Sequence, residues 1–108
     1  MWLSLAIDGG INIMNNALKG LQPEKVFMFF EELTQIPHGS HNTKQISDFC
    51  VDFAKKRGLK VYQDEYNNVV IYRPASKGYE NAPGVIIQGH LDMVCEKESG
   101  CTHDFTKD

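Results

Sequence analysis

A histidine and an aspartate two residues apart form the strongest candidate for chemistry in this sequence. His90 and Asp92 follow the apolar run Gly84-Val85-Ile86-Ile87-Gln88-Gly89. In an extended backbone the side chains of residues i and i+2 project from one face, so a carboxylate can hold one imidazole nitrogen while the other binds a metal ion. The pattern predicts His90 as a metal ligand that Asp92 orients. Spacing alone favours the structural alternative, a strand-end histidine that is satisfied by a nearby acid.

A second metal site has the right residue types but poor spacing. Its four candidate ligands are His90, Cys95, Cys101 and His103. Structural zinc sites favour paired ligands two to four residues apart, and neither cysteine has a close cysteine partner. The same separation argues against a redox pair of Cys95 and Cys101, because the Cys-x-x-Cys turn is missing. We therefore rank both arrangements below the His90–Asp92 pair.

The sequence context of the other candidate polar residues favours structural roles for them. His38 and His41 lie in the stretch Pro37-His38-Gly39-Ser40-His41-Asn42, which is typical of a tight connection between helices; the functional alternative is that one of them lines the site crevice. Asp104 and Asp108 are candidate site carboxylates, but a polar, irregular segment favours solvation. The sequence has no Gly-rich phosphate loop and no nucleophile elbow, so it does not support phosphoryl transfer or acyl-serine chemistry.

Two helices are expected to precede the candidate site. The first begins at Pro23 and ends before Pro37. The second carries an apolar stripe at helical spacing, has Ser40 or Asn42 as its N-cap, and is closed by Gly58. Cys50 falls on that stripe, where a free thiol acts as a small apolar group. The stripe consists of Ile46, Phe49, Cys50, Phe53 and Ala54.

Strands are predicted in the second half of the chain. Residues 59–62 and 69–72 alternate with period two around Asn67-Asn68, which indicates an antiparallel hairpin. The run from Gly84 to His90 is continuously apolar, which is typical of a central strand buried on both faces. Two helices followed by three strands predict an α/β or α+β fold; of these we expect α/β, with a mixed sheet that is incomplete.

Composition limits the function classes. The 108 residues are 42% hydrophobic with a formal charge of -3, which suits one soluble domain and disfavours nucleic acid as a partner. Three cysteines indicate a reducing compartment, and no run of about 18 apolar residues predicts a membrane span. We expect a cytoplasmic protein that uses neither membrane nor nucleic acid. Residues 1–20 lack a period and are interpreted as an extension, with Met14 as an alternative start.

Several strings together resemble a known family. From Leu21 to Asp108 the chain is similar to the cytosolic aminoacyl-histidine (Xaa-His) dipeptidases, or bacterial carnosinases, within the co-catalytic zinc peptidases. The most specific string is Gln88-Gly89-His90-Leu91-Asp92-Met93-Val94. The supporting strings are Phe29-Phe30-Glu31-Glu32, Ile36-Pro37-His38-Gly39-Ser40, Val61-Tyr62-Gln63-Asp64-Glu65, Arg73-Pro74-Ala75, Gly78-Tyr79-Glu80-Asn81 and His103-Asp104-Phe105.

The resemblance implies a fold, a reaction and a division of labour. Residues 21–108 would be the amino-terminal part of a phosphorylase/hydrolase-like zinc-peptidase catalytic domain. The parent enzyme would hydrolyse dipeptides such as aminoacyl-histidine with a water activated by two zinc ions, for which manganese or cobalt could substitute, and could be a homodimer. His90 would bind one zinc and Asp92 would orient His90. Later sequence would supply the other ligands, so this chain alone would be inactive. The alternative is a non-catalytic, autonomous binding or structural domain with a vestigial His-x-Asp.

Overall fold

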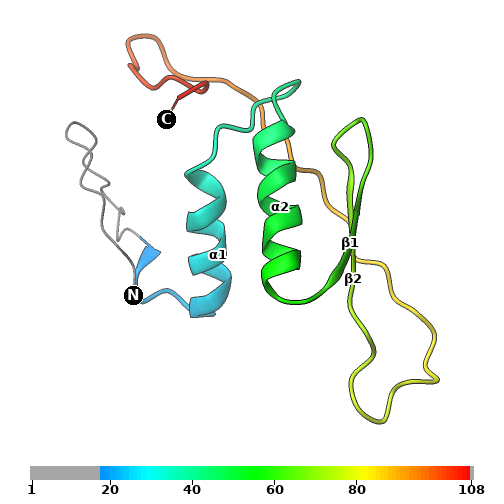
Figure 1. The fold of residues 1–108 in the computed structure, drawn as a ribbon. Helices are drawn as coiled ribbons and strands as arrows, with labels where there is room; N and C mark the ends of the chain where they lie inside the picture. The colour runs from blue at the N-terminus through cyan, green and yellow to red at the C-terminus, as the bar shows by residue number, and fades with distance from the viewer. Residues whose placement is uncertain (1–17, 108) are drawn as a thin grey trace, which may run out of the picture. The chain divides into compact units, whose positions relative to one another are not determined.

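A computed structural model of the chain describes residues 18–107. Its elements are α1 (Glu24–Thr34), α2 (Lys44–Lys56), β1 (Lys60–Gln63) and β2 (Val69–Tyr72), in that order (Figure 1). The chain divides into two compact units, Met1–Glu32 and Leu33–Asp108. Most of the expected extension at residues 1–20, including Met14, lies outside the described residues. No described helix is long and apolar enough to cross a membrane.

Both predicted helices are confirmed. α1 begins directly after Pro23, whose fixed backbone angle suits a helix start, and carries an acidic residue in its first turn. α2 ends where expected: Gly58 has φ +66°, a left-handed conformation that glycine adopts at no steric cost. The predicted N-cap is wrong, because Thr43 takes that position, although its side chain makes no capping hydrogen bond. Ser40 contacts another segment instead.

The predicted hairpin is also confirmed. β1 and β2 pair antiparallel, with Lys60 opposite Tyr72 and Gln63 opposite Val69. The loop of residues 64–68 is closed by Asp64, whose Oδ1 accepts hydrogen bonds from the backbone N–H groups of Tyr66 (2.9 Å) and Asn68 (2.8 Å). Asn67 has φ 68°, a conformation that asparagine tolerates better than most residues. The loop chemistry therefore fixes where the two strands turn.

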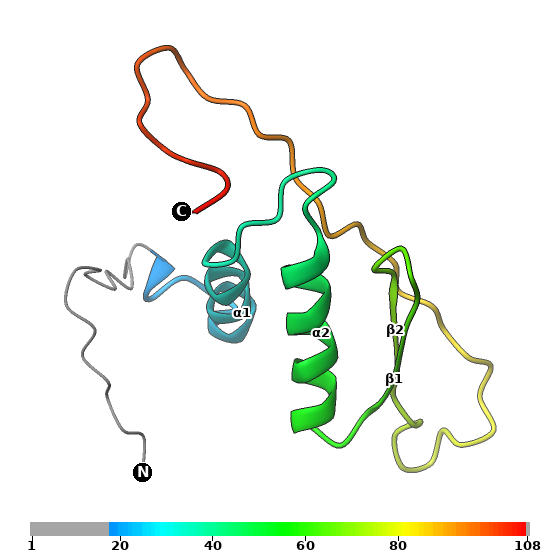
Figure 2. The ribbon, with the colours of Figure 1, turned by 45° about the horizontal axis from the view of Figure 1, so that its top comes forward.

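α2 packs against this hairpin (Figure 2). Ile46 and Ala54 on the apolar stripe are fully buried. Between them lies Ser47, also fully buried, whose Oγ donates a hydrogen bond to the Asn67 carbonyl oxygen (2.8 Å) and accepts one from Gln63 Nε2 (2.7 Å). A buried hydroxyl with both roles satisfied links the helix to the strand and its loop. The apolar pattern of this helix in the sequence does not predict the hydrogen bonds of Ser47.

The predicted central strand is wrong. Residues 84–90 form no strand, and Val85, Ile86 and Ile87 are 86%, 92% and 95% exposed. The described sheet is the two-stranded hairpin alone, so the mixed sheet is not formed within residues 18–107. A strand requires a partner for its backbone N–H and C=O groups, and apolar composition cannot supply one. The segment passes the N-terminal end of α2 and leads to the candidate site (Figures 1 and 2).

We expect Ser47→Ala to destabilise the chain by about 1 to 3 kcal/mol, because the Asn67 carbonyl loses its buried donor. Alanine's better helix propensity offsets only about 0.5 kcal/mol of this cost. Urea denaturation measures the difference as a lower midpoint with an unchanged slope. The matched control is Ser76→Ala on the exposed connection, which should change stability by less than about 0.5 kcal/mol. Equal stability of the two variants would contradict a structural role for the Ser47 hydroxyl.

Candidate metal-ligand site

Two segments far apart in the sequence are joined at the candidate site. The connection between α1 and α2 forms a parallel β-bridge, Gly39 to Met93, with the segment that follows His90. The backbone N–H of Met93 donates to the His38 carbonyl oxygen (3.0 Å), and that of Ser40 donates to the Met93 carbonyl oxygen (3.1 Å). These backbone bonds place Ser40 beside Asp92. The apposition positions the site without a regular sheet.

At this crossing Gly39 lies against the side chain of Cys95. It is buried, and a Cβ built on it would clash with Cys95 Sγ. The absence of a side chain at Gly39 leaves space for the Cys95 sulfur atom. The sequence predicts Gly39 as part of a tight connection; in the structure it also makes room for the Cys95 side chain.

We expect Gly39→Ala to weaken the bridge by about 0.5 to 1.5 kcal/mol, because the Cys95 Sγ must leave its rotamer to admit the new methyl group. Hydrogen exchange of the Ser40 and Met93 amides would report this local opening. Gly84→Ala is the matched control, because a Cβ at Gly84 meets open space. Adding Cys95→Ala to Gly39→Ala should restore protection, since it removes the clashing sulfur atom. Unchanged exchange in Gly39→Ala would contradict the steric argument.

The predicted His90–Asp92 pair is present and has a third member. His90 Nδ1 lies 3.0 Å from Asp92 Oδ1. The other carboxylate oxygen, Oδ2, accepts a hydrogen bond from Ser40 Oγ (2.6 Å). The two oxygens of one carboxylate are thus used by two different residues. Sequence spacing could predict the first contact, but it had no means of finding the second across 52 positions.

The protonation states follow from these contacts. The Ser40 hydroxyl and, next, the His90 hydrogen bond hold the pKa of Asp92 below its ordinary value, so the carboxyl group is ionised at neutral pH. An ionised carboxylate can only accept hydrogen bonds, so this contact needs a proton on His90 Nδ1. In the Nδ1–H tautomer the lone pair is on Nε2, and the His90 side chain is 82% exposed. This is the arrangement of a histidine available to bind a metal ion.

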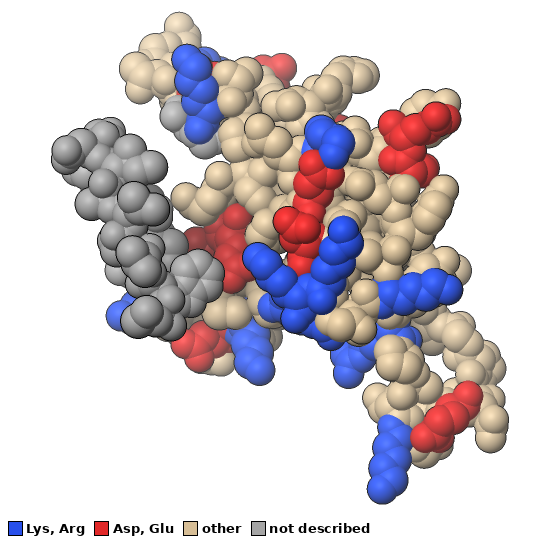
Figure 3. Space-filling model, in the orientation of Figure 1, with Lys and Arg blue, Asp and Glu red and all other residues tan. Residues whose placement is uncertain are grey.

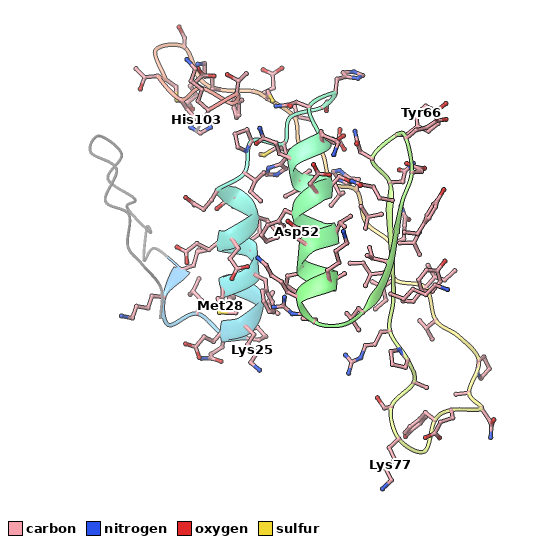
Figure 4. The ribbon with its side chains drawn as sticks, viewed as in Figure 1. Lys25, Met28, Asp52, Tyr66, Lys77 and His103 are labelled. Atoms are coloured by element: carbon pink, nitrogen blue, oxygen red, sulfur yellow. The ribbon has the colours of Figure 1, made fainter. Side chains whose placement is uncertain are left out.

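An open pocket of about 800 Å³ adjoins His90 and Asp92. His41 lines it together with residues of the hairpin loop, including Tyr66 at the tip of that loop (Figure 4). His41 has φ 67°, an uncommon conformation for a residue with a side chain. Of the two histidines in the connection between the helices, His41 is therefore the one that lines this pocket. His38 does not line the pocket; its Nδ1 hydrogen-bonds the Ile36 carbonyl oxygen instead.

The competing candidates are not brought together. Among residues 18–107, no group of three or more His, Cys, Asp and Glu side chains is arranged to hold a metal ion, so the alternative zinc site with Cys101 and His103 is not formed. His103 lines a different pocket from His90. Cys95 and Cys101 are free thiols. Burial raises the pKa of the half-buried Cys50 thiol, in agreement with an unreactive, packing role.

The acidic candidates near the end of the chain do not join His90 either. Asp104 lines the pocket that contains His103. Its carboxylate accepts hydrogen bonds from the hydroxyl and backbone N–H of Thr106, which with Lys107 lower its pKa to about 2. A local turn of this kind is a structural role. Asp108 lies outside the described residues.

The sequence and the fold of the chain are similar to those of known dipeptidases. The chain is 40% identical, over 91 residues, to the cytosol non-specific dipeptidase of Escherichia coli (strain K12). Its fold matches the crystal structure of aminoacylhistidine dipeptidase from Vibrio alginolyticus with a TM-score of 0.81 and 37% identity. The chain is thus a homologue of these dipeptidases, and the resemblance found in the sequence is confirmed. No protein-family model matches the chain.

The match covers most of this chain and little of either relative. It includes 84% of this chain in both comparisons, but only 19% of the E. coli protein and 19% of the Vibrio chain. The chain therefore spans about a fifth of the length of these relatives. The α/β architecture with two helices and a small sheet is shared, and it positions one histidine with its partners.

Proposed function

We propose that this chain contributes one metal ligand, His90, and its orienting residue, Asp92, to a dipeptide-hydrolysing metalloenzyme. The observation that supports the proposal best is the His90–Asp92–Ser40 chain of hydrogen bonds, which leaves Nε2 free. The donor set fits one ligand of a zinc site. The remaining ligands would come from the four fifths of the relatives' length that this chain does not match.

In the proposed enzyme one residue of this chain would bind the metal ion and another would hold that ligand in place. His90 would donate its Nε2 lone pair, while Asp92 would hold Nδ1–H and keep the imidazole from rotating. A bound pair of zinc ions would supply an activated water for hydrolysis, and manganese or cobalt could replace zinc. His41 and Tyr66 would form part of the wall against which a dipeptide lies.

The proposed setting follows the names of the relatives and the charge of the chain. The substrate would be a dipeptide such as aminoacyl-histidine, and the enzyme would act in the cytoplasm as a homodimer. Lys and Arg side chains occur among Asp and Glu side chains on the face drawn in Figure 3, and the formal charge is -3. Nucleic acid and membrane surfaces are therefore not proposed as partners.

The isolated chain should show no dipeptidase activity with zinc, manganese or cobalt. One imidazole leaves most of a metal ion's coordination shell to water, so neither metal site of a pair can assemble. A coupled assay of aminoacyl-histidine hydrolysis, with and without a chelator, measures this. Chelator-sensitive hydrolysis that is lost in His90→Ala would overturn the prediction.

A chimaera tests the proposal directly. The segment of the E. coli dipeptidase that aligns with this chain is replaced by residues of this chain, and dipeptide hydrolysis is compared with that of the same enzyme lacking the segment. Metal-dependent activity of the chimaera alone supports the proposal. A folded chimaera that binds no metal and hydrolyses no dipeptide would favour the alternative, an autonomous non-catalytic domain with a vestigial His-x-Asp.

A further inference from the structure

We propose that Ser40 is a positioning residue for His90 and acts through Asp92. The proposal rests on the function proposed above, because it concerns which nitrogen of His90 is free to bind a metal ion. Ser40 comes from the connection before α2, and His90 and Asp92 come from a segment about 50 positions later. It therefore couples two parts of the chain at the point where the ligand is oriented.

The contacts fix the carboxylate in one orientation. Ser40 Oγ donates to Asp92 Oδ2 (2.6 Å), which leaves Oδ1 directed at His90 Nδ1 (3.0 Å). A hydroxyl-to-carboxylate hydrogen bond is among the stronger kinds, because its acceptor is charged. Ser40 is itself held by its backbone N–H, which donates to the carbonyl oxygen of Met93, the residue that follows Asp92. One residue thus anchors both the backbone and the side chain of this segment.

Exposure explains why such an anchor matters. The Asp92 side chain is 40% exposed and that of His90 is 82% exposed, so water competes for every polar atom of the pair. A carboxylate without the Ser40 hydroxyl can rotate about its Cβ–Cγ bond and exchange Oδ1 for solvent. Nδ1–H then loses its fixed acceptor, and the hydrogen bond that selects the tautomer is lost. Ser40 would keep the Nε2 lone pair available by preventing this.

The test measures the tautomer of His90 in the full chain. Long-range ¹H–¹⁵N spectra at about pH 8, above the ordinary titration range of histidine, distinguish Nδ1–H from Nε2–H. His90 is assigned among the four histidines by comparison with His90→Gln. Ser40→Thr and Ser40→Val form a matched pair, because their side chains have the same shape and only threonine retains the hydroxyl. Backbone amide shifts of α2 and the hairpin verify that each variant is folded.

We expect mainly Nδ1–H in the unaltered chain and in Ser40→Thr, and a shift toward Nε2–H in Ser40→Val and Ser40→Ala. The proposal is overturned if Ser40→Val keeps the Nδ1–H tautomer, or if Ser40→Thr loses it to the same extent as Ser40→Val. This readout is independent of hydrolysis. An inactive chimaera with the expected tautomer shifts would therefore reject the dipeptidase function while retaining the positioning role of Ser40.

Discussion

Replacing His90 by alanine in the dipeptidase chimaera should reduce dipeptide hydrolysis by more than about 100-fold, beyond the range typical of residues that only orient a ligand. The substitution removes the Nε2 lone pair that the Asp92 contact leaves available. A zinc site that loses one of its few protein ligands loses metal affinity and the geometry of the bound water together. Hydrolysis rates at saturating zinc, together with the bound zinc per chain, measure both effects.

His103→Ala is the matched control for this prediction. It removes the same side chain from the other pocket, where the imidazole packs against the edge of Phe105. Activity and zinc content should remain close to those of the unaltered chimaera. Equal losses from the two substitutions would contradict the assignment of His90 and would revive the zinc site that includes His103.

Asp92→Asn should leave the fold intact and lower metal affinity or activity by about 10- to 100-fold, the usual consequence of altering a residue that orients a ligand. Asparagine keeps the shape of aspartate but is uncharged, and it has one oxygen acceptor in place of two. It therefore cannot accept hydrogen bonds from both His90 Nδ1 and Ser40 Oγ as the carboxylate does. The loss should be smaller than in His90→Ala, because the ligating nitrogen remains. Zinc competition with a chelator of known affinity measures the binding component.

The control for Asp92→Asn is Asp52→Asn on the exposed surface of α2 (Figure 4). It makes the same chemical change away from the pocket and should alter neither zinc affinity nor turnover. If Asp92→Asn also left both quantities unchanged, the His-x-Asp pair would be a satisfied pair of polar residues with no role in metal binding.

Short-range patterns predicted much of this fold. α1, α2 and the hairpin were recognised because their apolar residues recur at the period of a helix or a strand, and because proline, glycine and asparagine mark the boundaries. The His90–Asp92 contact belongs to the same class. Its two residues are adjacent on one face of the chain, so their spacing is enough to predict it.

The prediction of a central strand was wrong because a strand depends on a partner that local sequence does not specify. Residues 84–90 have the composition of a buried strand, yet Ile87 is 95% exposed. Apolar composition expresses a tendency to be buried, whereas a strand also requires the hydrogen-bonding edge of another segment. Within the described residues the pairing here is limited to the single bridge at Met93, beyond this run.

The sequence by itself determined the helices, the hairpin and the identity of the histidine and aspartate that form the candidate site. Only the tertiary structure decided what surrounds that pair. Ser40 donates a hydrogen bond to Asp92 and does not cap α2. Gly39 leaves room for the Cys95 side chain, and His41 lines the pocket beside His90. The period of a helix or a strand involves residues that are close in the sequence, so it can be recognised from a single sequence. Contacts between residues some 50 positions apart depend on how two backbones meet, and that is settled by steric fit and backbone hydrogen bonds.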